Sequence, residues 1–378
     1  MSLSSMRLAL RLARRDARRA KGRSVLVVIL LGLPVMAVAG AASLMDSFEL
    51  SEAERVERQL GGADALMSWD YDVPVEQWPF DQYAYPVDYD AEVEEVEHTR
   101  EDLEAVLPEG SRAIDVTLSQ TQTPTEYGGQ ALDVWGLDLS DPIAEGVYPV
   151  LEGEAPGDGE TALSQAAADK LGLGVGDEVE LSDLDGGKFE ISAIVEDPAS
   201  LKGQFAVVPP EVAGGELDHW LVDTPEPLLW EDVRELNEVG VGALSQAVAE
   251  NPPPESEYNA SAGPASQEDM MIIGMGILLV AMVILQIVLL AGPAFAISAK
   301  RRTREFALLA VNGATPAQVR RTVLAGGVVL GVISTLVSLT AGFAIAAAAT
   351  PLAENIVGQR AGDFSFFPAV TLPAALLA

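Results

Sequence analysis

The stretch SAKRRTREFALLAVNGATPAQVRR, residues 298–321, lies between two long apolar runs. It holds six basic residues and one acidic residue, although the 378-residue chain carries a formal net charge of −34. Its order predicts a helix over 300–311, a break at an Asn-Gly pair, and a second helix that begins at Pro316 with Thr315 as its N-cap. A signal that only orients a protein in a membrane does not need this architecture, so we expect a docking surface for a partner.

Three complete apolar runs divide the chain, at residues 24–45, 270–299 and 322–350. Each is longer than the roughly 20 residues that a helix needs to cross a bilayer, so each predicts a transmembrane helix. A fourth run, residues 366–378, is cut off by the end of the sequence, and we expect it to be the start of a fourth helix in a longer protein. The first run could instead belong to a signal peptide, but such apolar regions span only about 7–15 residues.

Basic and acidic residues are segregated along the chain. Residues 1–23 carry eight basic residues and one acidic residue, whereas residues 46–269 carry 53 acidic and eight basic residues. Cytoplasmic segments beside membrane helices are enriched in Lys and Arg. This rule predicts that residues 1–23 and 300–321 are cytoplasmic, that residues 46–269 form an extracytoplasmic domain with a linker, and that residues 351–365 form a short external loop.

The first part of the extracytoplasmic block predicts helices around an aromatic segment. A charged helix over 46–60 is expected to continue the first span and to end at Gly61-Gly62. Residues 69–90 hold seven aromatic residues, which indicates either a surface that grips a partner or a pair of strands with a small aromatic core. Residues 91–107 have apolar residues near helical spacing and predict one amphipathic helix, in which His98 is expected to be solvated.

The clearest local pattern lies in residues 150–197. The segment ETAL predicts a strand, Ser164 can cap the helix QAAADKL, and Gly172 can end that helix. DEVEL and KFEISAIVE then alternate as two strands. The turn between them, with Asp183, resembles the start of a calcium loop, but the later ligands are not at the required spacing, so a hairpin turn is favoured.

The remaining block shows weaker patterns. Residues 198–258 have little periodicity, although WEDVRELNEVGVGALSQAVA is expected to contain a helix. Residues 250–269 are rich in proline and polar residues and predict a linker. No P-loop, HExxH or GxSxG motif occurs, and two histidines without cysteine leave little material for a transition-metal site. We therefore expect no catalytic residues and no cofactor or metal bound by this chain, and the basic segments beside membrane spans do not predict nucleic-acid binding.

Two segments carry a family resemblance. In KRRTREFALLAVNGATPAQVRR, a basic cluster is followed by Arg304-Glu305, an apolar stretch, and Gly-Ala-Thr eight residues after the glutamate. GETALSQAAADKLGLGVGDEVEL is similar to a passage of the MacB-like periplasmic core domain. With the order of spans, they resemble the FtsX-like/MacB-like ABC transporter permeases, also called type VII or mechanotransmission ABC proteins. Ala310 and Asn312 depart from the family pattern, which more often has Arg and an apolar residue there.

The resemblance implies an α-helical transmembrane protein of a bacterial plasma membrane, with a mixed α+β extracytoplasmic domain of the MacB-like periplasmic core type inserted between transmembrane helices 1 and 2. It implies a permease subunit that works with a separate ABC ATPase, which binds ATP and Mg²⁺. It also implies a dimer of permeases, or a pseudo-dimer with a second half of a longer chain, in contact with lipid. The movement would export or extract a substrate, or activate an extracytoplasmic protein partner of the cell envelope.

The resemblance further implies that the helix after the second span docks in a groove of the ATPase. The residues expected to make this contact are Arg302, Arg304, Glu305, Phe306, Leu309, Gly313 and Thr315. Two other functions stay open at this point. One is a membrane receptor whose outer block senses a ligand, although such receptors usually continue into a long cytoplasmic region after the second span. The other is an outward-facing membrane enzyme, for which no nucleophile or metal set supplies support.

Overall fold

The computed structural model describes residues 21–88, 96–125, 128–184, 187–258 and 316–362, together with the single residues 278, 281, 285, 289 and 311. The chain divides into two compact units. Unit 1 comprises Met1–Glu49, Ser266–Ala353 and Ala361–Ala378; unit 2 comprises Leu50–Ala265 and Glu354–Arg360. Unit 2 thus resembles the extracytoplasmic block predicted at 46–269, with one addition, the segment Glu354–Arg360.

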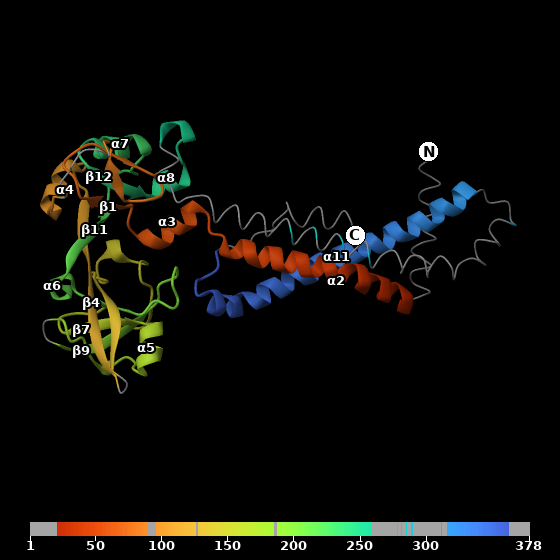
Figure 1. The fold of residues 1–378 in the computed structure, drawn as a ribbon, viewed down its shortest axis with the longest axis horizontal. Coiled ribbons are helices and arrows are strands. Elements are labelled where there is room, and N and C mark those ends of the chain that lie inside the picture. Colours follow the sequence, from red (N-terminus) through yellow and green to blue (C-terminus); the bar gives the residue numbers. More distant parts are fainter. Residues whose placement is uncertain are drawn as a thin grey trace. The chain divides into compact units, whose positions relative to one another are not determined.

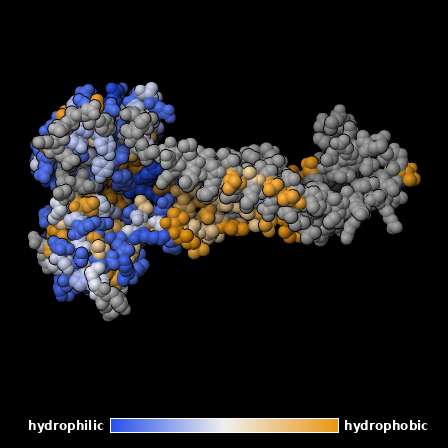
Figure 2. Space-filling view, viewed as in Figure 1, coloured by the Kyte–Doolittle hydropathy of each residue, from blue (hydrophilic) through white to orange (hydrophobic). Residues whose placement is uncertain are grey.

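Two long helices, α2 (Lys21–Phe48) and α11 (Pro316–Val357), contain most of the described residues of unit 1 (Figure 1). Both apolar runs that they contain are helical, as predicted. Within α11, Gly331–Val357 is long and apolar enough to cross a membrane, whereas α2 meets that test only when counted with the next helix as one broken span. Figure 2 shows that the coloured surface of these helices is mostly hydrophobic and that of unit 2 mostly hydrophilic.

The other two apolar runs lie largely outside the described residues. In the second run, residues 278, 281, 285 and 289 are described, and all four are helical and exposed. Residues 366–378 are outside the described part altogether. The loop expected at 351–365 differs from the structure, because α11 continues to Val357 and includes Pro351.

Small residues bring α2 and α11 together. A Cβ atom added at Gly342 would lie 2.6 Å from the backbone oxygen of Met36, and one added at Gly40 would lie 3.1 Å from the backbone oxygen of Gly342. The hydroxyl of Ser334 donates a hydrogen bond of 2.9 Å to the backbone oxygen of Val28. Close approach of this kind holds membrane helices together through van der Waals contact and hydrogen bonds.

A separate helix follows α2, where the sequence predicted one continuous helix over 46–60. α2 ends at Phe48, and α3 (Glu52–Leu60) begins after Ser51. The Ser51 hydroxyl accepts a hydrogen bond from the backbone N–H of Glu54, and the Glu54 carboxylate accepts one from the backbone N–H of Ser51. This capping box satisfies the first amides of a new helix, so the predicted continuity is wrong. The end of α3 at Gly61 is confirmed, with φ of +58°.

The core of unit 2 is a mixed sheet with the strand order β12-β1-β11-β4-β5-β10-β7-β9-β6, and β8 also pairs with β9. The pairs β10–β5 and β7–β9 are parallel and the other pairs are antiparallel. The strands are β1 (Ala65–Trp69), β4 (Arg112–Thr125), β5 (Gly128–Gly136), β6 (Val150–Gly153), β7 (Glu160–Ser164), β8 (Glu178–Glu180), β9 (Lys188–Val195), β10 (Phe205–Val208), β11 (Glu216–Asp223) and β12 (Val241–Ser245).

Short helices and a small second sheet complete unit 2. In Figure 1, α4, α7 and α8 lie beside β1 and β12, whereas α5 lies beside β7 and β9. The helices are α4 (Arg100–Val106), α5 (Gln165–Leu171), α6 (Pro210–Ala213), α7 (Trp230–Glu238) and α8 (Gln246–Glu250), with 3-10 turns η1 (Pro142–Ala144) and η2 (Glu255–Glu257). The second sheet pairs β2 (Val75–Gln77) with β3 (Ala84–Pro86).

Three groups of buried apolar side chains stabilise unit 2. One joins β5, β7, β9 and β10 to α5 and includes Leu163 and Ile191. A second joins β1, β11 and β12 to α4 and α7 and includes Leu103 and Trp220. The third includes Leu60 of α3 and packs that helix against the sheet. Removal of this apolar surface from water is the main force that holds the unit in one shape.

The predictions for residues 150–197 are confirmed. Ser164 caps α5 by accepting a hydrogen bond from the backbone N–H of Ala167, and Gly172 ends the helix with φ of +70°. β8 and β9 form the predicted hairpin. The carboxylate of Asp183 accepts a hydrogen bond from the backbone N–H of Gln122, so it ties the hairpin to β4.

The helix predicted over 91–107 is shorter in the structure. Residues 96–99 are not helical, and α4 starts at Arg100 because Thr99 and Asp102 form a capping box. The expectation that His98 is solvated is wrong. Its side chain is 8% exposed, and its ring centroid lies 3.9 Å from that of Trp69.

Most of the missed strands are in weakly periodic sequence. The helix expected within 230–249 is present as α7, but β10, β11, β12 and α8 were not predicted, nor was the long hairpin of β4 and β5. In the aromatic segment the strand-pair interpretation is confirmed by β2 and β3. Phe80 packs against the core there, whereas Tyr83 and Tyr85 are 41% and 48% exposed.

Candidate functional site

The seven predicted ATPase-docking residues lie outside the described residues: Arg302, Arg304, Glu305, Phe306, Leu309, Gly313 and Thr315. One neighbour, Val311, is described; it is helical and its side chain is 85% exposed. The start of α11 at Pro316 agrees with the predicted capped helix. The structure therefore shows the helix that follows the predicted docking segment, from Pro316 to Val357.

The last turn of α11 and the residues after it form a set of contacts within unit 2 that we call the clasp: residues 354–360 with residues 196–202 and Arg58. Its centre is Arg360. The guanidinium group donates two hydrogen bonds of 2.8 Å to the carboxylate of Glu196 and one of 2.9 Å to the carboxylate of Glu354. A bidentate arginine–carboxylate pair fixes orientation as well as distance.

Backbone groups extend the clasp on both sides of Arg360. The N–H of Leu201 donates to the carbonyl of Gly358 at 2.8 Å, and the N–H of Arg360 donates to the carbonyl of Pro198 at 2.9 Å. The ammonium group of Lys202 donates to the carbonyl of Ile356 at 2.7 Å. The last carbonyls of a helix have no partner within the helix, so a lysine at this position both satisfies one and complements the helix dipole.

Gly358 is required where the helix ends. Its φ is +91°, a conformation that L side chains rarely adopt. A Cβ atom there would also lie 3.0 Å from the side chain of Lys202. This glycine lets the chain leave α11 sharply enough for Arg360 to reach Glu196.

Hydrogen bonds and the two carboxylate charges favour the charged form of Arg360, whereas burial opposes it. Hydrogen bonding to Glu196, and then to Glu354, raises the pKa of Arg360. The two carboxylates are largely buried, with 14% and 13% of their side chains exposed, whereas the arginine side chain is 45% exposed. Because the arginine is partly exposed, solvent screening reduces the contribution of the pair to stability. The bidentate geometry is retained.

A groove of about 1080 Å³ in unit 2 runs past α4, β4 and the loop before η1. Its two arginines are both paired: Arg112 donates two hydrogen bonds of 2.6 Å to Asp141, and Arg100 lies 3.6 Å from Asp115. Hydrogen bonding to Arg112 lowers the pKa of Asp141. Further carboxylates line the groove: Glu101, Glu104, Asp138, Asp158 and Glu211.

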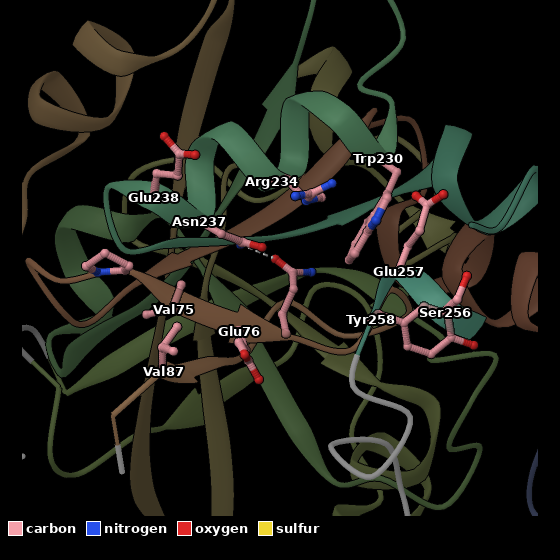
Figure 3. Close-up of a pocket in the computed structure, with 12 residues that line it drawn as sticks. Val75, Glu76, Val87, Trp230, Arg234, Asn237, Glu238, Ser256, Glu257 and Tyr258 are labelled. Atoms are coloured by element: carbon pink, nitrogen blue, oxygen red, sulfur yellow. Dashed lines mark hydrogen bonds between the residues drawn. The ribbon is translucent and has the colours of Figure 1, made fainter. Parts of the chain in front are cut away.

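A smaller pocket of about 430 Å³ lies between β2 and α7 (Figure 3). Val75 and Trp230 contribute to its walls. At its floor the side-chain oxygen of Gln77 accepts hydrogen bonds from Asn237 at 2.8 Å and from the backbone N–H of Ala243 at 2.9 Å. These bonds tie β2 to α7 and β12, so the floor is part of the packing of unit 2.

None of these features has the composition of a metal centre. Within the part of the chain that the structure describes, no group of three or more His, Cys, Asp or Glu side chains is arranged to hold a metal ion. The most extensive set of contacts described above is the clasp, which holds the last turn of α11 within the α/β domain of unit 2.

Comparisons with known families identify the class. The profile of the MacB-like periplasmic core domain matches residues 24–236, and that of the FtsX-like permease C-terminal domain matches residues 271–378. The first match alone covers more than half of the chain. The chain therefore belongs to the FtsX/MacB-like ABC transporter permease family. This family consists of membrane permease subunits with a periplasmic domain, which work with an ABC ATPase in a partner subunit.

Solved structures show a limited likeness. The periplasmic region of MacB from Actinobacillus actinomycetemcomitans is 9% identical, with 52% of this chain and 97% of that chain covered and a TM-score of 0.34. The extracellular domain of the ABC-type transporter YknZ from Gram-positive bacteria is 15% identical, with 39% of this chain and 89% of that chain covered and a TM-score of 0.29. No curated protein matches the sequence.

Proposed function

We propose that this chain is the multi-pass membrane subunit that transmits ATP-driven movement from a separate ABC ATPase to unit 2. The observation that best supports this role is the course of α11. The helix starts at Pro316, directly after the predicted docking segment, and its last residues, Glu354–Val357, belong to unit 2. A displacement of the docking segment would therefore be passed along a single helix to the outer domain.

The docking segment supplies the input. Phe306 and Leu309 provide an apolar anchor of the kind that interface cores prefer, and Arg304 and Glu305 provide polar contacts. Arg302, Gly313 and Thr315 complete the proposed contact, with Gly313 at the break that the sequence predicts between two helices. Closure of two ATPase subunits around ATP moves the permease only if the docked helices bind the closed state with a different affinity from the open state.

Two ATPase subunits require two docking segments. We propose that they come from a dimer of this chain, or from a second half of a longer chain. The proposed topology places residues 1–23 and 300–321 in the cytoplasm and residues 46–269 outside, and the spans contact membrane lipid. ATP and Mg²⁺ would bind the partner ATPase.

The output is movement of unit 2. This movement either exports or extracts a substrate at the membrane surface or activates an extracytoplasmic partner of the cell envelope. The FtsX-like match over residues 271–378 favours the permease over a ligand-sensing receptor, because it continues through the short segment between the second and third runs.

Co-purification tests the proposal. Full-length protein isolated from its own cells in mild detergent is expected to carry an ABC ATPase, and Glu305→Lys or Phe306→Ala is expected to remove most of it. Arg112→Gln, which changes the charge of unit 2 at a distant position in the sequence, is the matched control and should retain the ATPase. A wild-type protein that binds no ATPase would contradict the proposal.

A further inference from the structure

We infer that Arg360 is a positioning residue for force transmission, which fixes the outer end of α11 to unit 2 through Glu196. The inference rests on the proposed function. If α11 carries movement outward, its last turn must be held firmly in the domain that it moves. A loose connection would absorb the displacement, because helix ends and short loops open locally at little cost in free energy.

The hydrogen-bond geometry of Arg360 suits a positioning role. Its guanidinium group donates hydrogen bonds to both carboxylate oxygens of Glu196, in the segment after β9. It also donates one to a carboxylate oxygen of Glu354, in the last turn of α11. One planar group thereby holds two chain segments that are 164 positions apart in the sequence. Lysine, with one point charge and a flexible stem, cannot reproduce this fork.

Positive charge in unit 2 is concentrated in the clasp. Unit 2 contains nine basic residues among a large excess of acidic ones. Three of the nine, Arg58, Lys202 and Arg360, meet in the clasp, where Arg58 donates a hydrogen bond of 2.8 Å to the carbonyl of Arg360. The positive-inside rule does not explain these charges, because it concerns cytoplasmic segments and unit 2 is proposed to be extracytoplasmic.

Backbone groups as well as side chains hold the clasp together. The backbone amides of Leu201 and Arg360 donate hydrogen bonds that join the two segments directly. Gly358 supplies the backbone turn at the end of α11. These amides also report on the clasp, because an amide exchanges its hydrogen with solvent only when its hydrogen bond opens.

Hydrogen–deuterium exchange of the full chain with its ATPase tests the inference. Exchange is followed in wild type and Arg360→Gln, with and without a non-hydrolysable ATP analogue. In Arg360→Gln we expect the peptides covering 196–203 and 354–360 to exchange about tenfold faster. Loss of a charge-assisted bidentate pair should make local opening of the clasp about ten times more frequent. We also expect the nucleotide-dependent change in the rest of unit 2 to disappear while the ATPase still co-purifies.

Matched variants separate positioning from general stability. Arg112→Gln breaks a second bidentate arginine pair among the described residues of unit 2 and should keep the nucleotide-dependent change. Glu196→Gln removes the acceptor of the same ion pair as Arg360→Gln and should reproduce the exchange behaviour of that variant. It replaces Arg360→Gln in the test if Arg360→Gln does not fold. Arg360→Lys should restore only part of the response.

A reversible cross-link provides a second test. The natural chain has no cysteine, so Pro198→Cys combined with Arg360→Cys introduces one pair of thiols at segments joined by a backbone hydrogen bond. Oxidation should form the cross-link and restore the nucleotide-dependent change that the reduced protein has lost. Failure of the thiols to cross-link, or an unchanged response in Arg360→Gln, would overturn the inference. Absence of any nucleotide effect in wild type would instead contradict the proposed function.

Discussion

The guanidinium group of Arg360 lies 2.8 Å from each carboxylate oxygen of Glu196, although 164 positions separate the two residues in the sequence. The contact joins the segment after α11 to the loop after β9, both within unit 2. It gives the long apolar helix a defined end point in the α/β domain. The proposed force transmission depends on this end point and on the basic segment before Pro316, at the start of the helix.

Topology gives a first prediction. Single cysteines at Ser182 and Thr303 are expected to differ in reaction with a membrane-impermeant maleimide on intact cells from which the wall has been removed. Ser182→Cys should be labelled and Thr303→Cys should react only after lysis, because the proposed topology places the basic turn in the cytoplasm. Labelling of Thr303→Cys from outside would contradict the proposed topology; the naturally cysteine-free chain provides the blank.

Packing of the two long helices gives a second prediction. Gly342→Leu is expected to lower the thermal unfolding temperature of the detergent-solubilised chain by several degrees, because overpacking costs about 1–3 kcal/mol. The nearest group is the backbone oxygen of Met36, which cannot move aside as a side chain can. Val337→Leu is the control, since Val337 is 55% exposed. Equal unfolding temperatures in the two variants would contradict the close contact.

The Arg112–Asp141 pair gives a prediction for acid stability. Hydrogen bonding to Arg112 lowers the pKa of Asp141 below 3.8 in the folded protein. The pair therefore contributes its full stability above about pH 4, and loses it as the pH falls through the lowered pKa. Relative to wild type, Asp141→Asn should be destabilised at pH 7 and the difference should shrink below pH 4.

Urea unfolding followed by tryptophan fluorescence measures this difference, because all five tryptophans lie in unit 2. The side-chain amide oxygen that Asp141→Asn introduces can still accept the hydrogen bond from Ile143 that caps η1, so the variant tests the ion pair and not the cap. Arg112→Gln should show the same dependence on pH. A difference that stays constant from pH 7 to pH 3 would show that the Asp141 carboxylate is not stabilised by its partner.

The sequence predicted best where local signals agreed. In β7, α5, β8 and β9 the strand periodicity, the Ser164 cap and the Gly172 stop all indicate the same elements, and all are present. The hairpin of β4 and β5 was missed because its alternation is partly polar. Thr121 and Thr123 are 2% and 4% exposed, so hydroxyl-bearing residues occupy buried positions where an apolar pattern is sought.

Contacts between distant segments could not be predicted from local patterns. His98 is buried because β1 brings Trp69 against its ring, and no feature near His98 in the sequence indicates this. The clasp was missed for the same reason: Glu196, Lys202 and Arg360 lie in three polar stretches that carry no motif. The family motifs indicated the docking segment but contain no information about where α11 is anchored at its other end.

The most direct test of the central claim is hydrogen–deuterium exchange of the wild-type permease with its bound ATPase, compared in the presence and absence of a non-hydrolysable ATP analogue. If this chain transmits ATP-driven movement, nucleotide binding in the ATPase should change amide exchange in unit 2, including the clasp peptides 196–203 and 354–360. Identical exchange throughout unit 2 in both states, with the ATPase bound and occupied by nucleotide, would contradict the account.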